Sequence, residues 1–511
     1  MILSFGAPLL LSLILGVLIT SIFLPSGDRK TAVILLRLFG GGGLGIGIAS
    51  CIYYLCLLAG ITRYIAAIDV ALCLVLGSIY YMRRRNSNPG GQAGPPFGKA
   101  GTRSRLKDTI ALVFALELVA FAVSLVVSIL KEPHGRWDAW LIWNMHARFL
   151  YRGGEHWREA FAGGLDWSHW DYPLLLPLSI ARGWTYAGGE AILFPAAIGL
   201  IFTLLVLGLL LAALSHLRSK TQGCLAAMIL MGTPFFITMG ASQFADVPFA
   251  FFVLAAFVML FLPERSPEDR AGPLILAGIA AGLSAWTKNE GLLFVLIVTV
   301  SLVGIAARVS GWRKAFKRTG WFLAGALPVL AMVVDFKLRL SPTNDIMAGL
   351  SLAAVSAKLL DWGRYAEIAK AFFVTGISFT QGVIDVRVGM TLNPGAVGVL
   401  LLAVYLALTG VRIGEADRGS ILQAAAVLGL MLAGYFFVYV MTPLDLTWHL
   451  MTSLNRLFLQ LWPSALLLVF MAAGIPGESI FTQGRPAEAL SPKSDRVTPK
   501  KKTGRKAKEK K

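Results

Sequence analysis

The chain is poor in charged residues: only 15% of its 511 residues are Asp, Glu, Lys or Arg, whereas 56% are hydrophobic. A soluble globular protein carries about 25% charged residues, so this composition excludes an ordinary soluble domain. Acidic residues are the scarcer kind, and the formal net charge is +19. The positive residues cluster in short loops and in the C-terminal tail, which is typical of membrane proteins and argues against nucleic-acid binding.

Cysteines and the familiar metal and nucleotide motifs are also scarce. The four cysteines lie inside apolar runs, so we interpret them as small buried side chains and not as a disulfide or metal framework. There is no His-Glu-x-x-His, no Cys/His cluster, no Asp-x-Asp triplet and no phosphate-binding Gly-x4-Gly-Lys loop. The string Gly40–Gly45 matches Gly-x-Gly-x-x-Gly, but inside an apolar run it indicates close helix packing. No cofactor is certain, although Asp138 and Asp246 could hold one Mg²⁺ or Mn²⁺ with a substrate phosphate.

What the chain does have is a series of apolar runs long enough to cross ~30 Å of hydrocarbon. The runs predicted to span the membrane are 3–24, 31–59, 64–82, 109–130, 190–214, 223–240, 247–262, 271–287, 291–307, 320–338, 395–412, 420–441 and 457–475. The sequence therefore predicts an all-α polytopic membrane protein with about 13 transmembrane helices.

Basic loops predict the orientation. The segments 83–107 and 308–318 and the tail after Gly477 are rich in Lys and Arg, so all three are predicted to be cytoplasmic. The short apolar segment 172–186 is predicted to be an interfacial or re-entrant helix, because a spanning helix there would invert every later basic loop. This orientation places a set of polar residues on the outer face: Asp138, His169, Asp171, Asp246, His449 and Arg456.

A single carboxylate, Asp138, stands just after the apolar run 109–130 and is framed by Trp137 and Trp140. A carboxylate at the water boundary of a membrane helix is a poor lipid anchor, but it can accept a proton from a substrate hydroxyl. We therefore take Asp138 as the candidate general base. The alternative is an N-cap of a helix over 139–151, and the two tryptophans fit an aromatic belt as well as a substrate-binding platform.

Other charged residues stand at the predicted outer ends of helices. Asp171 and Asp246 each lie two residues before a proline, and both are candidate substrate contacts or helix caps. Lys288 and Glu290 lie in WTKNEG, at the junction of two predicted helices. Lys288 is a candidate cation for a substrate phosphate and Glu290 a candidate substrate contact, with a simple polar turn as the alternative.

Arg456 and His449 lie seven residues apart, and therefore on the same face of one predicted helix. Arginine suits a phosphate because its planar guanidinium donates two parallel hydrogen bonds. Both residues are therefore candidate phosphate contacts. The alternatives are an arginine that extends to the membrane surface and a histidine that is satisfied within the structure.

The order of these motifs resembles the GT-C class of membrane glycosyltransferases. The resemblance is to the family 39-like branch, which contains the protein O-mannosyltransferases and the lipid A aminoarabinose transferases. That class has a carboxylate in the first large outer loop, here Asp138, then a proline-containing interfacial segment, matched by DYPLLLP, and a helix–Asp–helix pattern, matched by FADVPFAFF. The resemblance runs from about 109 to 475. The chain departs from the mannosyltransferases in its single Asp138, where they have a paired Asp-Glu, and in its three added N-terminal helices.

The resemblance implies a helical fold with interfacial helices in the outer loops and a polyprenyl-phosphate sugar as donor. The sugar would pass with inversion to a hydroxyl of a lipid, glycan or protein acceptor. Four units are then expected: a three-helix membrane unit over 1–82, a basic cytoplasmic linker over 83–108, a GT-C-like catalytic domain over 109–475, and a disordered basic cytoplasmic tail over 476–511.

The alternative class is a polytopic transporter or lipid flippase. Such proteins carry charges near the bilayer midplane and are often built from internal repeats. Here most charges stand at helix ends, with Glu117 as the main exception, and no repeat is found. A non-catalytic membrane scaffold is the third interpretation. Polar residues that gather at the outer rim would favour the enzyme over the transporter.

Overall fold

The computed structural model describes residues 2–24, 31–86, 105–162, 168–262, 271–342, 352–378 and 396–475. These residues form helices and no strand, and one isolated β-bridge joins Val411 to Ala473. The predicted linker falls largely, and the tail wholly, outside the described residues.

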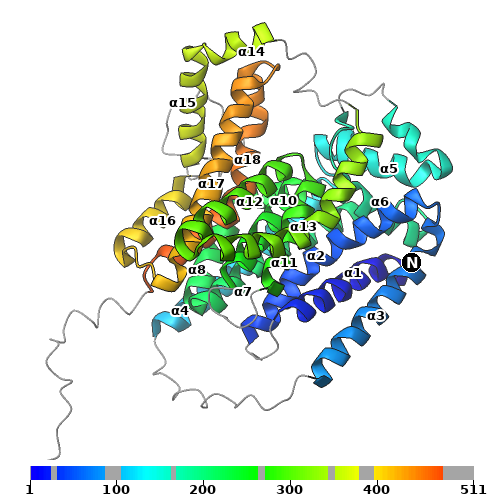
Figure 1. The fold of residues 1–511 in the computed structure, drawn as a ribbon, viewed down its shortest axis with the longest axis horizontal. Helices are drawn as coiled ribbons and strands as arrows, with labels where there is room; N and C mark the ends of the chain where they lie inside the picture. Colours follow the sequence, from blue (N-terminus) through cyan, green and yellow to red (C-terminus); the bar gives the residue numbers. More distant parts are fainter. Residues whose placement is uncertain are drawn as a thin grey trace, which may run out of the picture.

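The helices are α1 (Ile2–Phe23), α2 (Thr31–Leu58), η1 (Thr62–Tyr64), α3 (Ile65–Asn86), α4 (Arg105–Lys131), η2 (Ala139–Trp143), α5 (Asn144–Arg152), η3 (Gly154–Phe161), α6 (Leu175–Ala187), α7 (Leu193–Leu217), α8 (Lys220–Met231), α9 (Pro234–Ala241), α10 (Asp246–Phe261), α11 (Ala271–Thr287), α12 (Glu290–Ser310), α13 (Trp312–Arg339), α14 (Leu352–Leu359), α15 (Trp362–Ser378), α16 (Ala396–Thr409), α17 (Glu415–Met441) and α18 (Leu446–Ala472). Figure 1 shows them as one bundle, with α14 and α15 at one end.

Eight of the described helices are long and apolar enough to cross a membrane: α1, α2, α3, α4, α7, α13, α17 and α18. The protein is therefore an all-α polytopic membrane protein, as the hydropathy of the chain predicts. The run 223–240, predicted as one span, is two helices, because α8 and α9 meet at an angle of 70° around Gly232 and Thr233. Pro234 explains the break, since it cannot donate the backbone hydrogen bond that would continue α8.

The N-terminal helices pack closely through glycine. A Cβ atom on Gly16 of α1 would lie 1.8 Å from the carbonyl oxygen of Gly41 on α2. Only glycine permits this approach of two backbones, which is the arrangement typical of packed membrane helices. The glycine string 40–45 is thus part of a helix–helix contact, and α2 continues through it without interruption.

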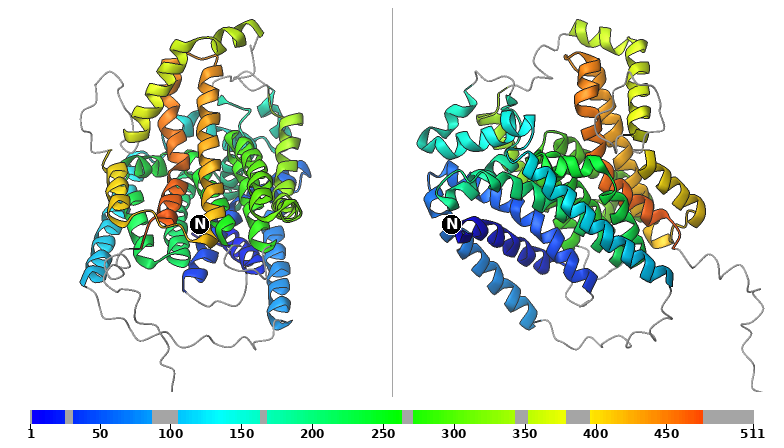
Figure 2. Two further views of the ribbon diagram at one scale, coloured as in Figure 1. Left: turned by 60° about the vertical axis from the view of Figure 1, so that its left-hand side comes forward. Right: turned by 180° about the vertical axis from the view of Figure 1, so that it is seen from behind.

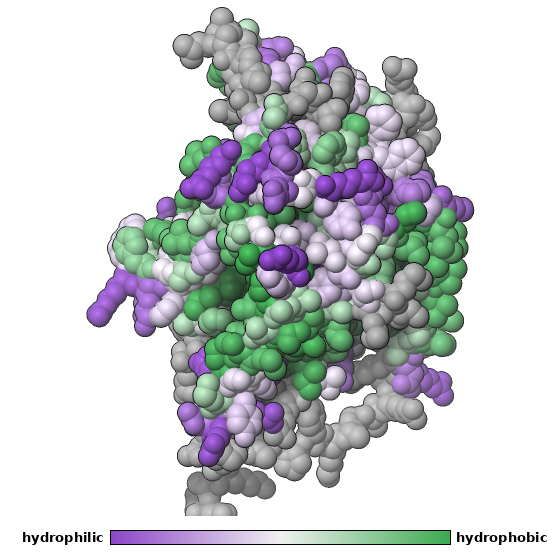
Figure 3. Space-filling view, turned by 90° about the vertical axis from the view of Figure 1, so that its right-hand side faces the viewer, coloured by the Kyte–Doolittle hydropathy of each residue, from purple (hydrophilic) through white to green (hydrophobic). Residues whose placement is uncertain are grey.

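Different segments of the chain form the two ends of the bundle. At one end, Arg83 at the end of α3 donates to the carbonyl of Ile22 at the end of α1, over 3.0 Å. The ends of α3 and α4 that border the linker lie at the bottom of Figure 1, opposite α5 and α14, and Figure 2 shows the same separation from two other sides. Between the two ends, Figure 3 shows a broad hydrophobic surface bordered by hydrophilic residues above and below.

The helix α6 has 13 residues, which corresponds to about 20 Å and is too short to cross ~30 Å of hydrocarbon. Glu190, which follows α6, binds Arg152 of α5 through a double hydrogen bond, so the chain leaves α6 at the end of the bundle where it entered. Arg182 of α6 is buried against Asp69 of α3 and Ser12 of α1. The expectation of a helix here that does not span is met.

Candidate active site

Asp246 is the centre of a group of ionised side chains. It is the first residue of α10 and is fully buried. Its Oδ1 atom accepts hydrogen bonds from Lys288 Nζ at 3.0 Å and from Gln460 Nε2 at 2.7 Å. Its Oδ2 atom accepts from Nε and Nη2 of Arg456, at 3.0 and 2.8 Å. A buried carboxylate needs such partners to stay charged, and Asp246 has two cations and an amide.

Arg456 joins this buried carboxylate to Asp138. The Nη1 atom of Arg456 donates to Asp138 Oδ2 over 2.6 Å, while its other two nitrogens face Asp246. The side chains of Arg456 and Asp138 are 19% and 20% exposed, whereas Asp246 is wholly covered. Phe244 lies under the guanidinium, 4.9 Å from its central carbon. The guanidinium therefore faces the open side of the group with Asp138.

Asp138 reaches Arg456 because its loop is fixed to the segment before α10. Gln243 donates to the carbonyl of Pro133 over 2.9 Å and accepts from Asn144 over 2.8 Å. At Gly135, φ is +75°, and a Cβ atom would lie 2.7 Å from the carbonyl oxygen of Ser242. Glycine is needed here because the two loops touch through their backbones. The loop that holds Asp138 and the start of α10 thus form one unit.

Neither carboxylate acts as a helix cap, which was the alternative for both. Asp138 precedes η2, but its side chain makes no capping hydrogen bond. Asp246 stands inside the first turn of α10, whose cap position is Ala245. By contrast, Asp445 does cap α18, since its carboxylate accepts from the backbone N–H of Trp448 at 2.8 Å. The interactions of Asp138 and Asp246 are with the charged group.

Lys288 and Glu290 belong to the same group. The ammonium of Lys288 lies 3.0 Å from Asp246 and 3.1 Å from Glu290 Oε1. Burial opposes the charge of Lys288, but the carboxylates of Asp246 and Glu290 outweigh it and raise its pKa. Lys288 is therefore a fixed cation, and Glu290 is the more exposed of its two partners. The junction at 286–291 thus carries ion pairs to Asp246 and within itself, which a simple polar turn would not.

A divalent metal ion does not fit the pair Asp138 and Asp246. Both oxygens of Asp246 already accept from cationic or amide donors, so none faces a metal ion. Only Asp138, with one oxygen on Arg456, keeps a carboxylate oxygen without a described contact. No group of three or more His, Cys, Asp or Glu side chains that could hold a metal occurs within the described residues. We derive no catalytic step through a metal.

Asp171 lies in a neighbouring polar group instead of the central one. It is 2% exposed and accepts from Asn289 Nδ2 over 2.8 Å. Lys337 at the end of α13 lies 3.8 Å from its carboxylate and also donates to its backbone carbonyl. Because Asn289 stands between Lys288 and Glu290 in the chain, the two groups share one helix junction. Asp171 is thus held beside the central group by protein partners.

Three other predicted residues lie apart from the charges. His449 binds Thr442 Oγ1 over 2.9 Å and packs on the ring of Tyr439, so its described contacts are structural. Trp137 and Trp140 are 71% and 58% exposed. They flank Asp138 in the chain, and Trp140 donates to the carbonyl of Gly135. Because both rings are exposed, each can contact membrane lipid or a substrate.

Sequence reasoning missed two uncharged members of the site. Gln460 lies one turn beyond Arg456 on α18 and is itself held by the Tyr435 hydroxyl at 3.2 Å. Tyr172 stacks between Trp143 and His169, with ring centroids 5.6 and 5.0 Å away. Burial, then the carboxylates of Glu290 and Asp171, raise the pKa of the Tyr172 hydroxyl. The four-residue spacing of Arg456 and Gln460 was the only available signal for Gln460.

Residues 180–336 match the sequence model of the dolichyl-phosphate-mannose-protein mannosyltransferase family. The match contains Asp246, Lys288 and Glu290 and stops short of Asp138 and Arg456 on either side. No curated protein and no solved structure matches the chain. The resemblance predicted from the motifs is therefore present over 180–336, and it supports a membrane glycosyltransferase of the GT-C type.

Proposed function

We propose that this membrane glycosyltransferase takes its sugar from a polyprenyl-phosphate donor and passes it to an acceptor hydroxyl on the outer face of the membrane. The observation that supports it most is the contact of Asp138 with Arg456, beside Lys288. A base for the acceptor and two cations for a phosphate then stand side by side, where one substrate could touch all three. The charges gather at helix ends, which favours the enzyme over the transporter or flippase.

The donor phosphate would bind to Arg456 and Lys288. Lys288 has three N–H bonds, and the carboxylates of Asp246 and Glu290 use two of them. Arg456 keeps two nitrogens on Asp246, while the third, Nη1, is bound to Asp138 on the open side. A phosphate that approaches Nη1 takes the place of the Asp138 carboxylate. Asp246 and Gln460 meanwhile hold the rest of the guanidinium in position.

This exchange leaves Asp138 free to act as a base. Its carboxylate loses the contact with Nη1 of Arg456, so both of its oxygens can face the acceptor hydroxyl. Asp138 then accepts the proton of the acceptor hydroxyl, whose oxygen forms a bond to the anomeric carbon. The bond from that carbon to the phosphate oxygen breaks, and polyprenyl phosphate leaves with the electron pair. Attack opposite the leaving group inverts the anomeric carbon.

The acceptor is therefore expected to react only after the donor has bound. As long as Arg456 binds Asp138, the carboxylate is occupied by the guanidinium and does not face the acceptor hydroxyl. Trp137, Trp140 and Glu290 lie around the open side and are the candidate contacts for sugar or acceptor. Asp171, next to Tyr172, is a further candidate for contact with the substrate on this side of the site. His449 is the weakest candidate for the phosphate, given its contacts with Thr442 and Tyr439.

The reaction can be tested with the purified full chain in lipid nanodiscs. Polyprenyl-phosphate sugars and nucleotide sugars are supplied in parallel, and released polyprenyl phosphate and glycosylated acceptors are measured by mass spectrometry. Release of polyprenyl phosphate that depends on an added acceptor is the expected result. Turnover of nucleotide sugars alone contradicts the proposal. The acceptor class follows from comparing surface glycans and glycolipids of cells with and without the gene.

The orientation is a separate part of the proposal. The loop with Asp138 is outside, and the basic residues at the end of α3, the 308–318 loop and the C-terminus are cytoplasmic. Single cysteines at Gly154 and Ser87, in a background without the four native cysteines, report the side by reaction with an impermeant thiol reagent on intact cells. Labelling at 154 and protection at 87 are expected. The reverse pattern contradicts the assignment of both faces.

A further inference from the structure

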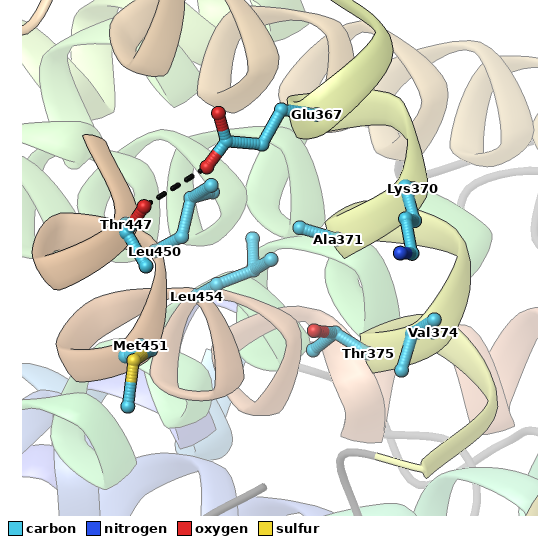
Figure 4. A pocket seen from close by; sticks show the side chains of 9 residues that line it. All are labelled: Glu367, Lys370, Ala371, Val374, Thr375, Thr447, Leu450, Met451 and Leu454. Atoms are coloured by element: carbon cyan, nitrogen blue, oxygen red, sulfur yellow. Dashed lines mark hydrogen bonds between the residues drawn. The ribbon is translucent and has the colours of Figure 1, made fainter. Parts of the chain in front are cut away.

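A groove lies between α15 and α18, away from the candidate active site (Figure 4). It encloses about 230 Å³. Five apolar side chains line it, Ala371 and Val374 from α15 and Leu450, Met451 and Leu454 from α18, together with four polar ones, Glu367, Lys370, Thr375 and Thr447. The interior is hydrocarbon-like. Glu367 accepts a hydrogen bond from Thr447 over 3.0 Å across one end of it.

The walls of the groove are held apart by contacts behind it. Arg364, in the first turn of α15, donates to the backbone carbonyls of Tyr439 and Val440 at the end of α17, over 2.8 and 2.9 Å. Two turns further on, Phe372 packs on Phe436 and Phe458, with ring centroids 5.4 and 5.7 Å apart. These contacts fix α15 to α17 and, through Phe458, to α18, and the groove lies between α15 and α18 beside them.

The groove and the candidate active site lie on opposite faces of α18. Thr447 lines the groove and Arg456 lies nine residues later, which is two and a half turns of an α-helix. The lining residues Leu450 and Leu454 follow Thr447 along the same face, at spacings of three and seven residues. A donor whose phosphate lies on Arg456 is therefore bound on the face of α18 opposite the groove. The groove is then available to a different lipid.

We propose that this groove binds one acyl chain of an anionic phospholipid whose phosphate lies near Lys370. The groove lies beside the first third of α18, a helix that is long and apolar enough to cross a membrane. Met451, one of its lining residues, is 42% exposed, so an apolar side chain of the groove reaches the surface. Lys370 stands at the edge of the groove on α15, and its ammonium suits a lipid phosphate.

The bound lipid would join the α14–α15 arm to α18 on the side that protein contacts leave open. An apolar cavity that opens to the membrane is filled by hydrocarbon more favourably than by water. This proposal does not rest on the transfer reaction, because the groove shares no residue with the charged group. It therefore stands or falls separately from the proposed glycosyl transfer.

The test uses the full chain in nanodiscs that contain phosphatidylglycerol with a photoreactive group at the middle of one acyl chain. After illumination, labelled peptides are mapped by mass spectrometry. Labels within 367–375 and 446–454 are expected. Labels spread over the lipid-facing helices, with none concentrated there, overturn the proposal. Because this map is made on the unchanged protein, it does not depend on the folding of a variant.

Variants then show whether the groove itself is responsible. Ala371→Phe fills the groove and should lower this labelling at least tenfold, because several methylene groups lose their place. Ala366→Phe, the same change on an exposed part of α15, should leave it unchanged. Lys370→Gln should lower labelling by the phospholipid about two- to fivefold, but not labelling by a photoreactive diacylglycerol without phosphate. Equal labelling in Ala371→Phe and the unchanged protein overturns the proposal.

The donor lipid is the remaining competitor. A tenfold excess of a polyprenyl phosphate should not displace the photoreactive phospholipid from these peptides, since its phosphate site is on the other face of α18. Displacement would show that the groove holds the polyprenyl chain and would overturn the proposal. That result would still leave the transfer reaction intact.

Discussion

Two Asp–Arg pairs lie in this protein with the same 2.6 Å contact but in different surroundings. Asp69 and Arg182 join α3 to α6, and their side chains are 2% and 5% exposed. Asp138 and Arg456 join the loop after α4 to α18 and are 20% and 19% exposed. The first pair is closed on all sides, whereas the second keeps an open side where a substrate can approach.

The partners of the two pairs differ as well. Around Asp69 and Arg182, the remaining contacts come from neutral groups: the Tyr186 hydroxyl, Ser12 and the carbonyl of Pro8. Around Arg456 the remaining contacts come from a second carboxylate, Asp246, itself bound to Lys288. All described contacts to Asp69 go to Oδ2, and its Oδ1 atom is buried without a hydrogen-bond partner among the described residues. A closed pair with only neutral neighbours serves packing. In the second pair, two carboxylates bind one guanidinium, so another anion can replace one of them.

The largest expected effect tests the open pair. Asp138→Asn should lower the rate of transfer about 10²–10⁴-fold, because a general base contributes that much. Folding should be unaffected, since Asp138 does not cap a helix and Arg456 keeps Asp246. Turnover of the purified variant measures the effect. Asp445→Asn, in which Asn still caps α18, is the matched control and should keep normal activity. Near-normal turnover of Asp138→Asn would make this pair structural too.

The closed pair should respond in stability instead. Arg182→Met leaves a buried Asp69 without its cation, and the free energy of unfolding should fall by about 3–5 kcal/mol. Denaturant unfolding in detergent measures it, while turnover per folded molecule should be normal. The double variant Asp69→Leu with Arg182→Met should recover much of the loss, because an apolar pair can replace a buried ion pair. A drop in turnover without loss of stability would contradict the division between the two pairs.

A finer test separates charge from geometry at the open pair. Arg456→Lys keeps one positive charge but cannot reach Asp246 and a phosphate through parallel N–H bonds, so donor affinity should fall about 10- to 100-fold. Arg456→Leu should be worse, because Asp246 loses a cation. Affinity is measured by titration with a short-chain polyprenyl-phosphate sugar, and acceptor affinity should not change. If neither variant changes donor affinity, Arg456 only fixes Asp138 and the phosphate belongs to Lys288.

The difference between the pairs also shows what the sequence could predict. Asp138, Lys288, Glu290 and Arg456 could be chosen because charges at the ends of apolar runs are rare and costly. Asp246 was chosen too, but its depth was not foreseen, since only the packing of α10 against α18 shows it to be fully buried. Most predicted spans correspond to helices because ~20 apolar residues have few other structures open to them.

What could not be predicted depends on rotations and contacts between helices. The pair Asp69–Arg182 joins residues 113 positions apart, and neither segment has a sequence pattern that predicts its partner. Gln460 and Tyr172 carry no charge, so hydropathy gave them no weight. The bend at Gly232 and Thr233 is a different case, because Pro234 signals it in the sequence and only the high hydropathy of 223–240 favoured one continuous span. His449 was predicted as a phosphate contact from its spacing to Arg456. Because α18 packs against α17, the described contacts of His449 are with Thr442 and Tyr439.

The smallest expected effect concerns a third buried polar group, on α5. His146 is fully buried, donates a hydrogen bond from Nε2 to the carbonyl of Ser168 over 2.8 Å, and stacks on Trp170. Burial lowers its pKa to about 3. Unlike Asp69 and Asp138, it has no ion-pair partner among the described residues, and it is neutral at physiological pH.

This neutral state makes the packing around α5 sensitive to acid. The unfolded chain takes up a proton at His146 near pH 6.5, whereas the folded chain does not do so above about pH 3. Stability is therefore full above pH 6.5 and falls as the pH is lowered, by about 2 kcal/mol between pH 7.5 and pH 5. His146→Gln, which keeps a donor to Ser168, should flatten this dependence in unfolding measurements. His156→Gln, an exposed histidine, should not. If His146→Gln loses stability in acid as steeply as the unchanged protein, the acid-sensitive groups lie in the ion pairs.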